Sequence, residues 1–257
     1  MTLGSGEPGP GTLAAALAAS RATGRARIEM VTTIAGPSGP VALIHRGAYD
    51  QPSGRARAES DMSALAAALE EAGLPPGGDW SHPNGVVVDG ETLYSQLGPM
   101  AESLGREPTD WIRVPLLAVM AQGATDNDAL ALALDPLGPL DLLQRRVVEI
   151  GGADDCEVRG TPVRHLRASL ALDGLTPDGA TGPSPSSFEG RLRAAGVDVL
   201  PVEVWLDESD VVRRLRVSLD DALGGGGLST TFDVYDVEGD VDIEVPHPDT
   251  VAGTNPN

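Results

Sequence analysis

Apolar and polar side chains alternate along much of the first part of the chain. Residues 25–34 place every second side chain on one face of a strand, and a Gly/Pro-rich turn at 36–40 separates this run from a second one at 41–49. The side chains on the first face are Ile28, Met30, Thr32 and Ile34. A third strand follows within 54–65. Consecutive strands without an intervening helix predict an antiparallel meander.

Segments of helical composition interrupt the strands. Residues 12–23 begin with Thr12, a residue that caps helices well, and continue with strong helix formers. Similar composition predicts helices at 63–74 and at 136–146. We therefore expect short helices inserted into a chain that is mainly strand.

Turn residues divide the rest of the chain into further strands. The pair at 89–90, Asp-Gly, is typical of a tight turn and predicts a hairpin. Further strands are expected at 110–115, 156–174, 228–239 and 241–245, and a Pro/Ser-rich loop at 176–187 leads into a helix at 184–196. With about ten or eleven strands and no change of composition between the halves, the pattern predicts one domain built on one large antiparallel sheet.

The stretch LPVEVWLDESDVVRRLRVSLD has a clear strand-turn-strand pattern. A turn at 208–209 would place Trp205 opposite Val212, and Glu203 opposite Arg214. The apolar face would then consist of Val202, Val204, Leu206, Val211, Leu215, Val217 and Leu219, interrupted only by Arg213. We expect the charged residues to lie on a solvated face and the aliphatic row to face the interior.

The aliphatic face needs a cover. A sheet of about ten strands offers more apolar area than a few short helices can cover, so we expect a cavity for an apolar ligand. The pattern leaves the alternative of a fully packed core open. The residues expected to line the cavity are Val202, Val204, Leu206, Leu215, Val217 and Leu219, together with Ile28, Met30 and Leu170.

Composition narrows the classes of partner. Hydrophobic residues make up 41% of the 257 residues but aromatic residues only 3%, so the interior must be mainly aliphatic. The chain has 38 acidic and 18 basic residues, and its net charge is −20. Such a surface repels phosphate backbones, and nucleic acid is not an expected partner. The sequence also lacks an apolar run long enough to span a bilayer.

No residue pattern indicates catalysis or metal binding. The four histidines are scattered without the close spacings of a zinc site, and the segment with Asp126 and Asp128 lacks the glycine and distal glutamate of a calcium loop. Cys156 has acidic neighbours, which disfavour a reactive thiolate. The sequence has neither a nucleophile elbow nor a phosphate-binding loop. We expect a protein that is not an enzyme and uses no metal or cofactor.

Six segments in order carry a resemblance to a known family: ARIEMVTTIAG, VDGETLYSQLG, DWIRVP, LDPLGPLDLL, VRGTPVRHLRASLAL and VEVWLDESDVVRRLRVSL. Their order resembles the LolA/LolB-type lipoprotein-carrier superfamily, especially the actinobacterial envelope lipoproteins of the LppX/LprG group. The resemblance implies a curved antiparallel half-barrel of about eleven strands, with helices lidding its apolar concave face. It also implies that this face holds lipid or lipoprotein acyl chains.

The resemblance implies a place in the cell envelope, outside the cytoplasm, and an envelope protein as donor or acceptor of the ligand. The sequence departs from the group in having no signal peptide and no lipobox cysteine, and taken literally it would be cytoplasmic. We expect a loose tether at 1–11, one domain at 12–250, a flexible tail at 251–257, and a monomer.

The expected function is non-enzymatic binding and transport of an apolar acyl-chain ligand, such as a lipid, glycolipid or lipoprotein. The alternative is a protein-protein interaction or sensor module with a filled core, which would use the exposed sheet face around Trp205.

Overall fold

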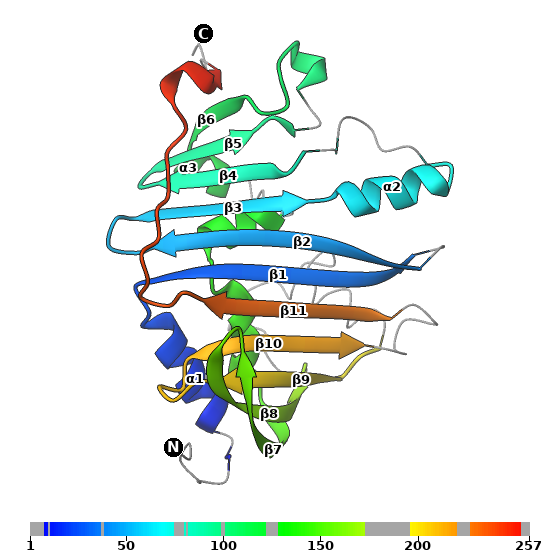
Figure 1. Ribbon diagram of the computed structural model, residues 1–257, viewed down its shortest axis with the longest axis vertical. Helices are drawn as coiled ribbons and strands as arrows, with labels where there is room; N and C mark the ends of the chain where they lie inside the picture. Colours follow the sequence, from blue (N-terminus) through cyan, green and yellow to red (C-terminus); the bar gives the residue numbers. More distant parts are fainter. Residues whose placement is uncertain are drawn as a thin grey trace. The chain divides into compact units, whose positions relative to one another are not determined.

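The computed structural model describes residues 8–9, 11–36, 39–74, 80, 82–98, 101–121, 128–172, 196–219 and 227–252. Its internal contacts divide the chain into two compact units. Unit 1 consists of Met1–Thr23 and Pro139–Tyr235, and unit 2 of Gly24–Gly138 and Asp236–Asn257. Figure 1 shows the strands and helices of both.

Unit 2 is built on a run of hydrogen-bonded strands in the order β12-β6-β5-β4-β3-β2-β1. These are β1 (Arg25–Gly36), β2 (Gly39–Asp50), β3 (Arg55–Asp61), β4 (Asn84–Asp89), β5 (Thr92–Gln96), β6 (Trp111–Pro115) and β12 (Val251–Ala252). The neighbours β1 to β6 pair antiparallel, whereas β12 pairs parallel to β6. The predicted meander and the hairpin at 89–90 are therefore present.

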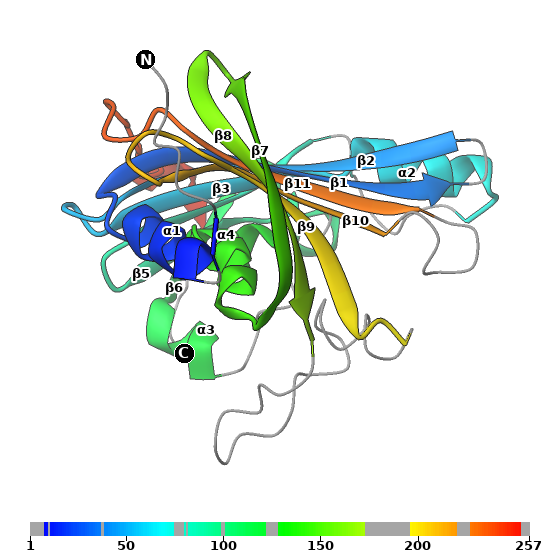
Figure 2. The same cartoon turned by 90° about the horizontal axis from the view of Figure 1, so that it is seen from below.

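One face of the unit 2 strands is covered by a helix, and we call it the helix face of unit 2. Helix α4 (Asp128–Leu134) contacts β2, β3 and β4, and its residues Ala129, Leu132 and Ala133 are buried. Figure 2 shows α4 beneath the strands. In the middle of this face the cross-strand neighbours have small side chains. Ile28 pairs with Gly47, and Gly47 pairs with Ala58. Small residues there leave room for the larger side chains beside them.

The opposite face of unit 2 is polar and carries an extended strap. Ion pairs cross this face, including Arg25–Asp50, Arg46–Glu29 and Arg55–Asp89. Residues 236–247 run over the same strands without forming a strand (Figure 1). Val241 and Ile243 of the strap are buried in a cluster with Ala48 and Val87, against which Tyr94 and Trp111 pack.

The prediction of a strand at 241–245 is therefore wrong. The alternation of apolar and acidic residues there is real, but the apolar side chains pack onto the face of the sheet and the backbone joins no ladder. Two hydrogen bonds hold the start of the strap: Glu238 N–H donates to Arg25 O at 2.9 Å, and Gly24 N–H donates to Glu238 Oε1 at 2.6 Å.

The remaining helical segments of unit 2 are short. They are α2 (Ser63–Glu71), α3 (Leu116–Ala121) and the 3₁₀ turns η2 (Glu102–Leu104) and η4 (Pro248–Thr250). Helix α2 was predicted, whereas α3 and α4 were not, because each spans at most seven residues and is too short for a periodicity to stand out.

Unit 1 carries strands in the order β11-β10-β9-β8-β7. They are β7 (Val147–Val158), β8 (Thr161–Ala171), β9 (Val199–Leu206), β10 (Val212–Leu219) and β11 (Leu228–Tyr235), all paired antiparallel. Helix α1 (Gly11–Arg21) packs against β10. Its residue Ser20 links the two, because Val212 N–H donates to Ser20 Oγ at 2.9 Å.

Two predictions in unit 1 need correction. The run at 156–174 is not one strand but the end of β7 and the whole of β8, joined by a turn at Arg159 (φ 50°) and Gly160 (φ 79°). Two positive φ values suit a tight hairpin, and the arginine at the first position concealed the turn signal. The helix expected at 136–146 is a 3₁₀ segment, η3 (Gly138–Gln144). The loop at 176–187 and the helix at 184–196 lie outside the described residues, apart from Gly196.

The fold class expected from the sequence is confirmed: it is mainly antiparallel β, a large open sheet with a few helices. The described residues form twelve strands where about eleven were expected. Within the described ranges, no helix is both long and apolar enough to cross a bilayer.

Candidate functional site

One face of the unit 1 strands carries aliphatic rows that cross three strands, and we call it the helix face of unit 1 because helix α1 packs against β10. Leu166, Val204 and Leu215 are neighbours across β8, β9 and β10, and Ala168, Val202 and Val217 form the next row. Seven of the predicted cavity residues lie on these strands, and each is at most 4% exposed: Val202, Val204, Leu206, Leu215, Val217, Leu219 and Leu170. The structure brings these seven together on one buried face.

The pairing of β9 with β10 differs from the predicted register. Leu206 pairs with Val212, but the next pair is Trp205 with Arg214, so that Arg213 is an extra residue in a β-bulge. Arg213 Nε donates to Asp207 Oδ2 at 2.6 Å. This bond holds the bulged residue at the turn.

The bulge changes which residues of β9 and β10 pair with each other, but most side chains remain on the sheet face that was predicted for them. Beyond it the register is shifted by two residues, and an even shift keeps each side chain on its face. The predicted pair Glu203–Arg214 is therefore wrong, because Glu203 lies opposite Arg216. Val212, which was placed beside Trp205, lies instead on the helix face with Leu206.

The two remaining predicted residues, Ile28 and Met30, belong to unit 2. Ile28 is fully buried on the helix face, whereas Met30 is only half-buried. The same partial exposure continues along β1 and β2 at Thr32, Ile34 and Leu43, which share that face. Apolar surface thus remains accessible along the second half of β1.

A polar row that the sequence analysis missed crosses the helix face of unit 2. His45, Ser60 and Asn84 are neighbours across β2, β3 and β4, and His45 pairs with Met30 on its other side. His45 Nδ1 lies 2.6 Å from Ser60 Oγ, and Asn84 Oδ1 is buried without a hydrogen-bond partner among the residues that the structure describes. The only signal in the sequence is a polar residue at an expected inward position in each of three strands.

The polar face of unit 1 carries a tightly packed row. His165 stacks on Trp205 with the ring centroids 4.3 Å apart and the planes inclined by 3°. Arg214 donates to both carboxylate oxygens of Asp233, at 2.6 and 2.7 Å, and Arg159 Nε donates to Asp233 Oδ2 at 2.8 Å. Burial alone would raise the pKa of Asp233, but the hydrogen bonds and charges of the two arginines outweigh it and lower the pKa. Trp205 is therefore a half-buried member of a packed row.

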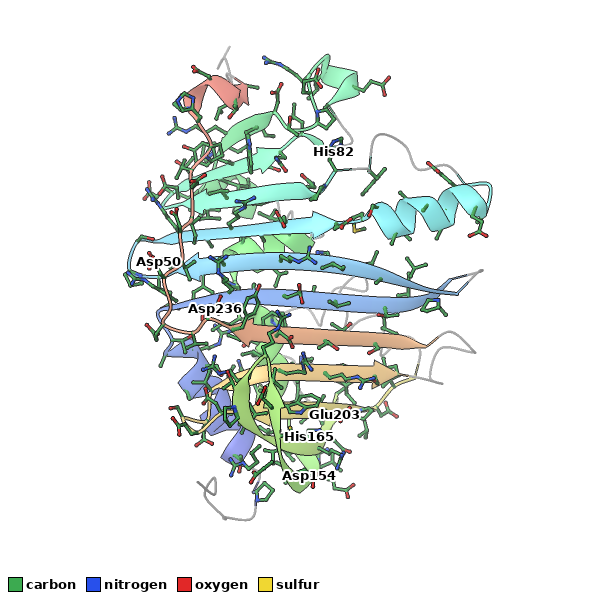
Figure 3. All side chains as sticks on the ribbon, in the orientation of Figure 1. Asp50, His82, Asp154, His165, Glu203 and Asp236 are labelled. Atoms are coloured by element: carbon green, nitrogen blue, oxygen red, sulfur yellow. The ribbon has the colours of Figure 1, made fainter. Side chains whose placement is uncertain are left out.

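A groove of about 400 Å³ lies beside this row on the polar face of unit 1. Side chains and backbone from β7, β8, β9 and β10 line it, among them Glu149, Arg167, Ser169, Glu203, Arg216 and Ser218. Glu203 Oε2 lies 2.9 Å from His165 Nε2, so that this side of the groove adjoins the ring that stacks on Trp205. Figure 3 labels His165 and Glu203, which lie next to each other. Of these residues, the sequence placed only Glu203 and Arg216 on an ordinary solvated face, and it gave no signal for a groove.

The described residues contain no group of three side chains that could hold a metal ion. Cys156 is exposed on β7.

No protein-family model matches the chain, and no curated protein matches it. Among solved structures, the lipoprotein LppX from Mycobacterium tuberculosis is 13% identical, and the match covers 92% of this chain and 100% of LppX with a TM-score of 0.49. LprF from Mycobacterium bovis is 14% identical, with 94% and 99% covered and a TM-score of 0.48. A LolA superfamily protein from Nitrosomonas europaea is 9% identical, with 91% and 93% covered and a TM-score of 0.32.

Proposed function

We propose that this protein is a non-enzymatic carrier that binds the acyl chain of a lipid, glycolipid or lipoprotein on its helix-covered apolar surface. The observation that carries the proposal is the incomplete cover of the helix face of unit 2. Ile28 is fully buried there, whereas Met30, Ile34 and Leu43 on the same face keep part of their surface accessible. An aliphatic surface of this kind binds a hydrocarbon chain without any catalytic group.

The energetics favour an acyl chain as the ligand. Each buried CH₂ group contributes about 0.8 kcal/mol, so a chain of ten or so methylenes supplies useful affinity from apolar contact alone. The row of His45, Ser60 and Asn84 next to Met30 offers hydrogen-bonding groups to the polar end of an amphiphile. The buried Asn84 Oδ1, which has no hydrogen-bond partner within the described ranges, would gain one there.

The proposal gives the nine predicted residues three roles. Met30 would contact the ligand directly, and the buried Ile28 would support Met30 on the same face of β1. The seven residues of unit 1 would form an apolar wall, and all of them are buried. The proposal also includes a place in the cell envelope, where a donor and an acceptor protein exchange the ligand.

The test is lipid retention and uptake by the purified protein. Organic extraction followed by mass spectrometry should identify a co-purifying acyl lipid, and a fluorescent fatty acid should bind the delipidated protein. The double variant Met30→Gln/Ile34→Gln should weaken the uptake at least about tenfold, because both side chains present apolar surface on the helix face.

The matched control is Val31→Gln on the same strand. Val31 is also half-buried, but it pairs with Ile44 on the opposite face. The control should bind the fatty acid as the unaltered protein does. A protein that neither retains nor takes up any lipid, or a control that loses uptake to the same extent, would contradict the proposal.

A further inference from the structure

The groove on the polar face of unit 1 has a floor of small side chains. In β8 to β10 the row through Ser169 and Pro201 continues to Ser218, and β7 contributes Gly151. Two register shifts in β7, one before Glu149 and one after Gly151, bend this strand where it borders the groove. Small residues and a bent strand together leave the hollow of about 400 Å³, a size in the range of small-molecule sites.

Two arginines of the groove keep most of their hydrogen-bonding capacity. Arg167 Nη1 lies 3.6 Å from the nearest carboxylate oxygen, on Asp154, and Arg216 Nη1 lies 3.8 Å from Glu203. Both distances exceed hydrogen-bond length. Their side chains are 60% and 46% exposed. On the neighbouring row, by contrast, Arg214 makes two hydrogen bonds of 2.6 and 2.7 Å to Asp233.

The two arginines flank a single residue. Arg167 and Arg216 both lie opposite Glu203, from the strands on either side of β9. Their Cα atoms are therefore about two strand spacings, or roughly 10 Å, apart, and their long side chains can converge above β9. Glu203 does not occupy both of them, because its other oxygen lies 2.9 Å from His165 Nε2.

Other groups of the groove favour a ligand with hydroxyl groups. Ser218 Oγ is buried and has no hydrogen-bond partner in the described chain, which is unusual for a buried hydroxyl. Ser169 adds a second hydroxyl, and Glu149 offers a carboxylate that accepts hydrogen bonds but cannot donate them.

We propose that this groove is a second binding site, for a phosphate ester of a hydroxylated molecule. Two guanidinium groups that approach from opposite sides suit a tetrahedral phosphate, whose oxygens point in several directions, better than a planar carboxylate. Ser218 would donate to a phosphate oxygen, and Glu149 would accept from a hydroxyl group of the ligand. The site does not depend on the carrier function, because it uses the opposite face of β8 to β10.

The test is calorimetric titration of the purified protein at about 0.15 M salt, where long-range attraction is screened. We expect glycerol 3-phosphate to bind, and inorganic phosphate, which lacks carbon-bound hydroxyls, to bind more weakly. Arg167→Gln and Arg216→Gln should each weaken the binding at least about tenfold, which corresponds to about 1.4 kcal/mol. Ser218→Ala should weaken it several-fold without changing the charge.

The matched control is Arg57→Gln. Arg57 is similarly exposed, at 48%, and lies 3.4 Å from Glu59 in unit 2. The substitution removes the same charge from another polar face, so the Arg57→Gln variant should bind glycerol 3-phosphate as the unaltered protein does. Absence of binding in the unaltered protein, or an equal loss in the Arg57 variant, would overturn the proposal.

Sedimentation with lipid vesicles distinguishes two sources of the phosphate ester. Binding to phosphatidylglycerol vesicles but not to phosphatidylcholine vesicles, lost in Arg167→Gln, would identify a lipid headgroup as the ligand. Binding of glycerol 3-phosphate without vesicle binding would identify a soluble ester. Vesicle binding that Arg167→Gln and Arg216→Gln leave unchanged would contradict a role of the groove.

Discussion

The helix faces of the two units are built from the same alternation of aliphatic residues but are buried to different extents. In unit 1 the predicted wall residues on β9 and β10 are at most 4% exposed, and α1 packs against β10. In unit 2 the same kind of face is fully buried at Ile28 but only half-buried at Met30 and Ile34. The same sequence pattern therefore serves a packed core in one unit and leaves accessible apolar surface in the other. The exposure, and not the pattern, distinguishes a stabilising face from a candidate binding face.

The largest effect that separates the two faces is expected from truncating Leu206. This side chain is completely buried beside Val212, so Leu206→Ala should lower the free energy of unfolding by about 2–5 kcal/mol. Ile34→Ala is the matched variant in unit 2, and it should cost less than about 1.5 kcal/mol because Ile34 keeps part of its surface in water. Urea unfolding monitored by circular dichroism measures both. An equal loss would show that the two faces are packed alike.

The next largest loss of stability is expected on the polar face of unit 1, which is opposite its buried aliphatic face. Asp233 is 3% exposed and accepts hydrogen bonds from Arg214 and Arg159, so Asp233→Asn should destabilise the protein by about 2–3 kcal/mol. This is less than for a fully buried pair, because the side chains of Arg214 and Arg159 are 33% and 37% exposed.

The same residue predicts a dependence on pH. The pKa of Asp233 is lower in the folded state than in the unfolded chain, so the ionised carboxylate stabilises the fold above the unfolded value of about 4. This contribution is lost as the pH falls from about 4 through the folded pKa. Thermal unfolding between pH 7 and pH 2 should show a steeper loss in the unaltered protein than in Asp233→Asn. Parallel curves would mean that Asp233 titrates alike in both states.

The sequence alone was sufficient to predict the turns and strand faces that depend on local residue patterns. The Asp-Gly turn at 89–90 and the Gly/Pro turn at 36–40 both join strands, and the aliphatic row from Val202 to Leu219 lies on one buried face. Because side chains alternate with a period of two, the assignment of faces survived a shift of two residues in the register.

Features that depend on distant residues could not be predicted. The strap at 241–243 packs on Ala48 and Val87, far away in the sequence. The bulge at Arg213 depends on a nearer residue, Asp207, which accepts a hydrogen bond from its guanidinium, and the strand pattern carries no signal for it. The polar row through His45 and the groove at Arg167 likewise arise from side chains on several strands. A single sequence shows each of these residues but not which strands are neighbours.

The smallest effect tests where the closed part of the unit 2 helix face ends. A Cβ atom on Gly47 would lie 2.8 Å from Arg57 O and 2.9 Å from Ile28 Cγ1, so Gly47→Ala must displace Ile28 or the backbone of β3. We expect a loss of about 1–2 kcal/mol from this overpacking. Gly151→Ala is the control, because a Cβ atom there meets nothing within 4 Å. It should leave the unfolding midpoint unchanged. A neutral Gly47→Ala variant would mean that Ile28 is as free to move as Met30, and that the accessible surface extends further along β1 than the burial of Ile28 indicates.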